Sequence, residues 1–183
     1  MPMCDIFIPT GALLPEAEQK LVARVSELLV DHELRRITDL MDDPESVKAS
    51  RERAGSIAWM FVHRTDTYLA GRPIEAPHYK FVVSIPEGTI DDRFAPAINR
   101  DIFAALVEAE GGKWPKPEQR VWVHIHEVLD GRWGAGGRVA PLKWVVDYVA
   151  PGLGDAAVAR FEAKRKSDAE GLVALAGRSD APA

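Results

Sequence analysis

Cysteine pairs, long apolar runs and an excess of one charge are all missing from this sequence. The single cysteine, Cys4, cannot form an internal disulfide bond or a cysteine-based zinc site. No apolar run reaches the roughly 18 residues that a membrane span needs, and no hydrophobic signal segment follows Met1. The 23 Lys and Arg and the 28 Asp and Glu are interspersed and give a net charge of −5, which argues against broad electrostatic binding of nucleic acid. We therefore expect a cytoplasmic protein with neither a membrane nor a nucleic acid as partner.

Motifs for cofactors and metals are also absent. The glycine-rich segment 134–137 lacks the Lys-Ser/Thr of a phosphate-binding loop, and Gly152 and Gly154 look like a loop rather than a nucleotide fingerprint. His124 and His126 offer two metal ligands, which are too few to hold a metal alone. We expect the protein to work without a cofactor or a metal.

The composition is that of an ordinary globular chain. Of its 183 residues, 46% are apolar and 28% are charged, and the chain contains 14 Gly and 13 Pro. These values exclude collagen-like, low-complexity and disordered chains. The length fits one compact domain with an appendage, and we place the domain at residues 2–140 and a helical extension at residues 141–183.

An internal repeat is the most informative feature of the sequence. The segment 8–11 (IPTG) recurs 77 residues later as segment 85–88 (IPEG). The apolar segment 58–63 resembles 121–126 at an offset of 63, so the first copy is 14 residues longer. Between these segments, the two copies share apolar positions with the spacing of one helix face, namely Leu21, Val25 and Leu29 in one and Ile98, Ile102 and Leu106 in the other.

Each copy predicts a strand, a helix and a second strand. Repeat one covers residues 2–64, with an insertion at 34–55 in which Asp43-Pro44-Glu45 is typical of a helix start, and repeat two covers 79–137. The expected strands are 3–9, 57–64, 79–86 and 120–127, and the expected helices are 15–33 and 91–110. A crossover through a helix implies parallel pairing within each unit. We expect an α+β fold, in which a tandem β-α-β repeat forms a four-stranded mixed sheet with two helices on one face.

Alternation along the strands predicts that one face of the sheet is left uncovered. In the last strand, the residues expected to face the helices are Val121, Val123 and Ile125, and those on the opposite face are Trp122, His124 and His126. In the first strand, one set is Cys4, Ile6 and Ile8, and the other is Met3, Asp5 and Phe7. An uncovered sheet face with aromatic residues needs a partner, so we expect a homo-oligomer.

Beyond residue 128 the sequence predicts a glycine-rich turn followed by helices. The turn is 131–137, a short helix is expected at 141–150, and one or two more are expected at 155–176. Ser167 and Glu170 have the spacing of a capping box that would restart a helix. This segment has few apolar anchors, so we expect a packing arm rather than a domain.

Pro2 is the first candidate for catalysis. The initiator Met is normally removed before a small residue, which would leave Pro2 as a secondary amine at the chain terminus. A terminal amine has an ordinary pKa of roughly 8, and partial burial in an apolar site lowers that pKa towards neutrality. Such a base can take an acidic proton next to a carbonyl and return it elsewhere. Proline occurs at about one position in twenty, so the evidence lies in its place immediately before the first strand of a repeat.

These features together resemble the tautomerase superfamily, whose subunits begin with a catalytic proline on a β-α-β unit. Members include 4-oxalocrotonate tautomerase, macrophage migration inhibitory factor and cis-3-chloroacrylic acid dehalogenase, and the last two fuse two units in one chain and form trimers. Pro2-Met3 resembles the opening of migration inhibitory factor, Pro15 the proline that opens its first helix, and 131–137 the turn that closes 4-oxalocrotonate tautomerase. The resemblance covers about 2–33 and 56–140, and it implies a homotrimer that acts on a small carbonyl or carboxylate substrate.

The resemblance also implies further site residues. His32 lies where migration inhibitory factor has an active-site lysine, and Trp122 and His124 fall where related enzymes place a tyrosine and an asparagine. Trp133 would form an apolar wall that lowers the pKa of Pro2. Each of these residues also has a structural interpretation: His32 as a surface histidine at a helix C-terminus, His124 as an interface residue and Trp133 as packing for the turn.

The family's substrate-binding arginines are missing. The arginine after the first strand of 4-oxalocrotonate tautomerase is Ala12 here, and the paired arginines of the dehalogenase fall at Pro86 and Thr89. Its water-activating glutamate has only Asp130 as a poor match. If a cation binds the substrate, it must therefore be another residue. The alternative is that the remaining basic residues are ordinary surface charges. The candidates are Lys80, Arg64, Arg120, Arg132 and Arg138, of which the last two flank the closing turn and are preferred.

Three interpretations follow. The resemblance implies a cofactor-independent tautomerase or isomerase in which Pro2 is the general base on an enol or 2-keto acid, with His124 and His32 as further catalytic candidates. A hydratase, dehalogenase or decarboxylase acting on an unsaturated carboxylic acid in the same site is an alternative reaction within this first interpretation. The second, which the missing arginines favour, is a non-enzymatic trimeric binding or scaffold protein on the same fold. The third is a generic α+β monomer.

Overall fold

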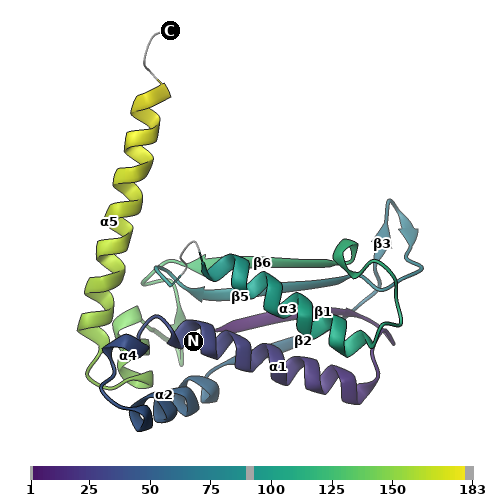
Figure 1. Cartoon of the computed structure of the whole chain (residues 1–183), viewed down its shortest axis with the longest axis horizontal. Helices are drawn as coiled ribbons and strands as arrows, with labels where there is room; N and C mark the ends of the chain where they lie inside the picture. The colour runs from purple at the N-terminus through teal and green to yellow at the C-terminus, as the bar shows by residue number, and fades with distance from the viewer. Residues whose placement is uncertain (1, 90–92, 180–183) are drawn as a thin grey trace.

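Two β-α-β units join into one sheet in the computed structural model, which describes residues 2–89 and 93–179, with side chains up to residue 170 except residue 168. The sheet has the order β2 (Trp59–Thr65), β1 (Met3–Pro9), β5 (Tyr79–Pro86) and β6 (Val121–Val128). The helices are α1 (Pro15–Leu34), α2 (Pro44–Ser56), α3 (Phe94–Glu110), α4 (Leu142–Val149) and α5 (Gly154–Ser179). In Figure 1, α1 and α3 lie on one side of the sheet, and α5 extends away from the end where α2 and α4 gather.

Short elements complete the chain. Two small hairpins are formed by β3 (Tyr68–Leu69) with β4 (Arg72–Pro73) and by β7 (Gly134–Ala135) with β8 (Arg138–Val139). Single 3-10 turns occur at Thr38–Leu40 and Pro117–Gln119. The β7–β8 hairpin is the glycine-rich turn that the sequence predicts after β6.

β1 is the strand that connects the two units. It pairs in parallel with β2, aligning Met3 with Trp59, and antiparallel with β5, aligning Met3 with Ser84. β5 pairs in parallel with β6, aligning Ser84 with His126. The predicted α+β class, the four-stranded mixed sheet and the parallel pairing within each unit are confirmed.

Local signals in the sequence set the helix starts. α1 begins with Pro15, whose fixed φ suits a first helical turn, and Glu16 and Glu18 follow near the positive end of the helix dipole. α2 fills the predicted insertion and begins where its cap was expected. The Asp43 carboxylate accepts a hydrogen bond from the Ser46 backbone N–H at 2.9 Å, which satisfies one donor of the first turn.

The main core lies between the sheet and its two covering helices. It contains the strand residues Cys4, Ile6, Ile8, Phe81, Val83 and Ile85 and the helix residues Leu21, Val25, Leu29, Ile98, Ile102 and Leu106. The helix positions are those that the repeat predicts, and Val121, Val123 and Ile125 pack on the same side, as the alternation predicts. Burial raises the pKa of the Cys4 thiol to about 12, so the thiol stays protonated at neutral pH.

A second apolar cluster joins the insertion to the C-terminal extension. It contains Val30 and Leu34 of α1, Ala54 of α2, Leu142, Val146 and Val149 of α4, and Phe161 of α5. Arg53 of α2 donates a hydrogen bond to the Val149 carbonyl at 3.0 Å, and Arg160 of α5 pairs with Asp39 at 2.6 Å. α4 and the first turns of α5 therefore pack against α1 and α2.

The prediction of a helix restart at Ser167 is wrong. α4 matches the helix expected at 141–150, but the segment expected to form one or two further helices is the single helix α5. No proline or glycine lies between 155 and 170, so nothing interrupts the helix and no new cap is needed. The start expected for α3 at residue 91 lies outside the described residues.

Replacement of Leu29 by Ala tests the main core. Leu29 is fully buried between α1 and the sheet, so the Leu29→Ala variant should lose about 2–5 kcal/mol of unfolding free energy in a urea titration. Leu69→Ala is the matched control, because Leu69 lies exposed on the β3–β4 hairpin and its truncation should change the stability by less than about 0.5 kcal/mol. Equal losses in the two variants would contradict this arrangement of the core.

Candidate functional site

Pro2 lies at the start of β1 with its side chain fully buried. Its carbonyl accepts a hydrogen bond from the Trp59 backbone N–H at 3.2 Å, which ties the residue to the start of β2. Because Met3 is opposite Ser84 in the antiparallel ladder, one further step places Pro2 opposite Ile85. The loop that follows β5 therefore begins beside Pro2.

Trp133 packs next to the same strand end. Its side chain is 8% exposed and belongs to a small apolar cluster with Ala140 and Val145, against which Met3 and Val128 pack. Its carbonyl accepts a hydrogen bond from the Ala140 N–H at 2.8 Å, which closes the turn around the β7–β8 hairpin. The structure thus brings the cluster of Trp133 to the residue that follows Pro2.

An apolar pocket of about 40 Å³ lies between the loop after β5 and the C-terminal helices. Pro86 at the end of β5 and Thr89 of the loop line it, together with Leu34 of α1, Val145 of α4 and Phe161 of α5. Val145 also belongs to the Trp133 cluster, so this cluster and the pocket share one side chain, although Pro2 is not among the residues that line the pocket. The sequence offers no local signal for this pocket, because α4 and α5 form one of its walls.

The carboxylate of Glu87 organises the loop after β5. It accepts a hydrogen bond from the Asp130 N–H at 3.0 Å and pairs with the Arg165 guanidinium of α5. Burial would raise the pKa of Glu87, but the hydrogen bond from Asp130 and the charge of Arg165 lower it below its ordinary value. Asp130 itself accepts hydrogen bonds from the N–H groups of Gly131 and Leu142, at 3.0 and 2.8 Å. Asp130 therefore holds the turn and the start of α4.

Trp122, His124 and His126 line the uncovered face of β6, as predicted. The ring centroids of neighbouring residues in this row are 6.0 and 6.3 Å apart. Glu127 is the residue of β6 that aligns with Ile85, and hence with Pro2. Trp122 is five residues away from that row, or roughly 16 Å along the strand. Within one chain, Trp122 therefore does not reach Pro2.

The first strand contributes a polar cluster to this uncovered face. Asp5 pairs with His63 at 2.6 Å, and the ring of Phe7 stacks on His63 with centroids 4.6 Å apart. The Nζ atom of Lys80 lies 5.4 Å from the centroid of Phe7. Lys80 is opposite Phe7, near the end of β1, so it too is separated from Pro2 by the length of the strand.

His32 is buried between the two covering helices. Its Nε2 atom lies 2.8 Å from an Asp101 carboxylate oxygen of α3, and its ring meets that of Phe94 edge to face. Burial would raise the pKa of Asp101, but the hydrogen bond with His32 and the nearby Arg100 lower it. The structure thus gives His32 a partner that links α1 to α3, and the expectation of a surface histidine is wrong.

The cations expected to bind a substrate are scattered. Arg120 is buried and forms a bidentate salt bridge with Glu110, with both N–O distances at 2.6 Å. Arg64 pairs with Glu18 at 2.7 Å. Arg132 and Arg138 are exposed on the two sides of the β7–β8 hairpin. Arg165, which sequence reasoning did not identify, is the cation that pairs with the loop after β5.

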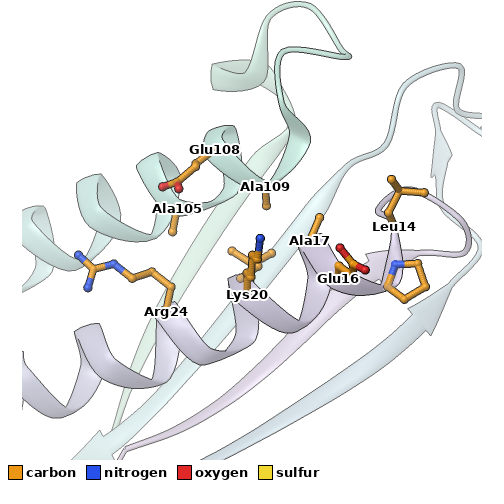
Figure 2. Close-up of a pocket in the computed structure, with 10 residues that line it drawn as sticks. Leu14, Glu16, Ala17, Lys20, Arg24, Ala105, Glu108 and Ala109 are labelled. Carbon is orange, nitrogen blue, oxygen red and sulfur yellow. The ribbon is translucent and has the colours of Figure 1, made fainter.

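A wide groove of about 880 Å³ lies between α1 and α3. Figure 2 shows its small floor residues Ala105 and Ala109 of α3 facing α1, with Lys20, Arg24 and Glu108 along its sides. The groove mixes both signs of charge and lies on the helix layer, apart from the strand ends that carry Pro2. It does not include the candidate site.

Two other features, a metal site and a membrane-spanning helix, are absent from the described residues. In the part of the chain that the structure describes, no three His, Cys, Asp or Glu side chains gather in a way that would hold a metal ion. Among the described helices, none combines the length and the apolar character needed to cross a bilayer.

Comparison with known proteins identifies the fold. No protein-family model matches the chain, and neither does any curated protein. The chain is similar to a fused 4-OT in the form of an asymmetric trimer, at 15% identity and a TM-score of 0.54, over 75% of this chain and 95% of that one. It is also similar to macrophage migration inhibitory factor from Toxoplasma gondii, at 18% identity and 0.52, over 74% and 97%. A member of the cis-3-chloroacrylic acid dehalogenase family matches at 14% identity and 0.55, over 84% and 88%.

These identities are low, so the likeness concerns the fold. The chain has the fold of the tautomerase superfamily, and the resemblance seen in the sequence is confirmed at that level. The likeness to this one member of the dehalogenase family covers 84% of the chain, more than the other two structures do.

A Glu87→Gln variant tests the charge in the loop after β5. The folded-state pKa of Glu87 is lowered, so its ionised form stabilises the fold above its ordinary pKa, and that contribution is lost as the pH falls through the folded-state value. The variant should therefore melt at a lower Tm than the wild type at pH 7. The difference between the two should shrink below about pH 4. Thermal unfolding between pH 3 and 7 measures it, and a difference that stays constant over this range would contradict the assignment.

Proposed function

We propose that the protein is a cofactor-independent tautomerase in which the Pro2 nitrogen is the general base on an enol or 2-keto acid. The observation that carries the proposal is the complete burial of Pro2 at the start of β1, one residue from the Trp133 cluster. Apolar surroundings disfavour the charged form of an amine, so this position supports a base that is uncharged near neutral pH. The fold that the chain shares with a fused 4-OT supports the same class of reaction.

In the proposed step, a proton moves between an oxygen and a carbon of the substrate. The Pro2 nitrogen takes the proton of the enol hydroxyl while the C=O bond forms and the C=C bond breaks. The carbon then takes the proton back from Pro2. Substrate and product are isomers and the amine ends as it began, so the reaction needs no oxidant, reductant or cofactor. The step requires removal of Met1, because a proline nitrogen in a peptide bond has no basic lone pair.

We further propose that the protein is a homotrimer. The uncovered sheet face carries Trp59, Phe61 and Trp122, whose side chains are 56%, 43% and 67% exposed, and association would bury them. A neighbouring chain would also supply Trp122 to a site that this residue does not reach within its own chain. The asymmetric and symmetric trimers of fused 4-OT support this assembly.

A non-enzymatic binding or scaffold protein on the same trimer is the second candidate. The small size of the apolar pocket beside Pro86 favours this candidate. The side chains of α4 and α5 leave a volume of only about 40 Å³ there. A cavity of roughly 10–15 Å³ already holds one water molecule, so this pocket has room for a few at most, and a substrate enters only if its wall moves. A hydratase is less well supported, because the nearby carboxylates of Glu87 and Asp130 already accept backbone hydrogen bonds.

Replacement of Pro2 by Ala tests the proposed base. The Pro2→Ala variant should ketonize phenylenolpyruvate about 100-fold or more slowly than the wild type, because the base changes in both strength and position. Pro15→Ala at the start of α1 is the matched control and should retain wild-type activity. Activity is followed by loss of enol absorbance, and intact mass reports whether Met1 is removed. Equal rates in wild type and Pro2→Ala, or a retained Met1, would refute the mechanism.

Trp122→Glu tests the trimer. A charge on the uncovered sheet face would have to be buried on association, so the variant should shift the assembly from three chains towards one. Light scattering coupled to size exclusion measures the mass. Leu14→Glu is the control, because Leu14 is 76% exposed at the start of α1, away from that face, and the change should leave the mass as it is. A wild-type protein with the mass of one chain would rule out the trimer.

A further inference from the structure

We propose that α5 completes the Pro2 site, with Arg165 binding the carboxylate of a 2-keto acid or its enol and Phe161 packing against the carbon chain. The proposal rests on the function proposed above and names Arg165, rather than Arg132 or Arg138, as the cation that binds the substrate. It also gives the C-terminal extension a role in substrate binding.

The position of Arg165 follows from the strand register. Pro2 is opposite Ile85 by the continuation of the β1–β5 ladder, and Glu87 comes two residues later in the chain. Arg165 pairs with the Glu87 carboxylate. The guanidinium therefore lies at the same end of the sheet as Pro2, although the two residues are separated by most of the sequence.

Phe161 lies one helical turn before Arg165, so the two side chains share a face of α5. Phe161 is 3% exposed and lines the apolar pocket with Pro86 and Thr89. It also touches the loop closely, because a Cβ placed on Gly88 would lie 3.0 Å from the Phe161 Cβ. One face of α5 thus presents an apolar ring to the pocket and a guanidinium to the loop that borders it.

The guanidinium of Arg165 has capacity for a second carboxylate. An arginine side chain carries five N–H donors, and the contact described for Arg165 joins one Nη atom to a Glu87 oxygen. The side chain is 44% exposed, so a ligand can approach it from solvent. The lowered pKa of Glu87 keeps that carboxylate ionised at neutral pH, and it holds the guanidinium at the loop. A substrate carboxylate would then bind the outer edge of the same guanidinium.

The small pocket implies that α5 moves when substrate binds. At about 40 Å³ the pocket does not accommodate an acid with an aromatic or branched carbon chain. The Phe161 ring has to shift to admit such a chain, and α5 shifts with it. An arginine on this helix links the movement to the charged end of the ligand.

The experiment compares Arg165→Gln with Arg160→Gln. Arg160 lies on the same helix in an exposed pair with Asp39, so its replacement controls for the loss of one α5 ion pair. The two probes are phenylenolpyruvate and the enol of its methyl ester, in which one added methyl group removes the carboxylate charge. Arg165→Gln should raise KM for the acid about 10–100-fold and leave KM for the ester within about twofold, whereas Arg165→Lys should recover part of the loss. Arg160→Gln should leave both values at the wild-type level.

A purely structural role for Arg165 would give a different result. Arg165→Gln would then change the acid and the ester equally, or change neither, and either outcome overturns the inference. The Tm of Arg165→Gln and of Arg160→Gln is also measured, so that a change in KM can be separated from a loss of folded protein. Arg132→Gln is run beside them, and an acid-specific effect there but not in Arg165→Gln would transfer the role to the closing turn.

Calorimetric binding of phenylpyruvate separates failure of this inference from failure of the proposed function. If the wild type binds phenylpyruvate without turnover and Arg165→Gln loses the binding, the tautomerase proposal fails and the Arg165 site stands. If Pro2-dependent turnover is present and Arg165→Gln matches the wild type, the inference fails alone. The absence of both turnover and binding overturns both.

Discussion

The antiparallel pairing of β1 with β5 is the constraint on which the rest of the structure depends. Each β-α-β unit forms its own parallel pair, and this ladder gives the two units one sheet and one core. It also places Met3 opposite Ser84, which brings the residues after β5 to the N-terminal end of the chain. A slip of one residue would exchange the core face and the aromatic face, because side chains alternate along a strand. The register therefore determines both the core and the neighbours of Pro2.

Most of the sheet and its two covering helices could be predicted, because the repeat and the strand alternation are local periodic signals. Pro2 could be identified as a candidate from its place before the first strand, whereas Trp133 became a candidate only through the family resemblance of its glycine-rich turn. The position of Arg165 could not be predicted, since it depends on how α5 packs against a loop 78 residues earlier. Periodicity placed His32 on a helix but not its carboxylate partner, which lies 69 residues away on α3.

Burial decides what each cation in this fold can do. Arg120 and Glu110 are 4% and 3% exposed, so both charges have lost water and their paired hydrogen bonds offset that cost. Arg120 therefore serves to hold the segment before β6 and is not available to a ligand. Removing either partner would leave an uncompensated buried charge. Arg64 is half exposed in its pair with Glu18, where solvent screening leaves little net stabilisation. Arg165 is exposed to nearly the same degree as Arg64, 44% against 50%, so it is held at one carboxylate yet open to solvent.

Gly88 makes the loop after β5 and the C-terminal helix interdependent. Its φ of +83° favours glycine, and any side chain there would meet Phe161 at 3.0 Å. A loop transplanted from another protein of this fold with a larger residue at that point would push the helix outwards, even if its own backbone were unchanged. Recombination between such proteins would therefore have to exchange segments 86–89 and 154–165 as one block. Because Gly88 and Phe161 are in such close contact, the sequence of the loop restricts the sequence of the C-terminal helix, and the reverse is also true.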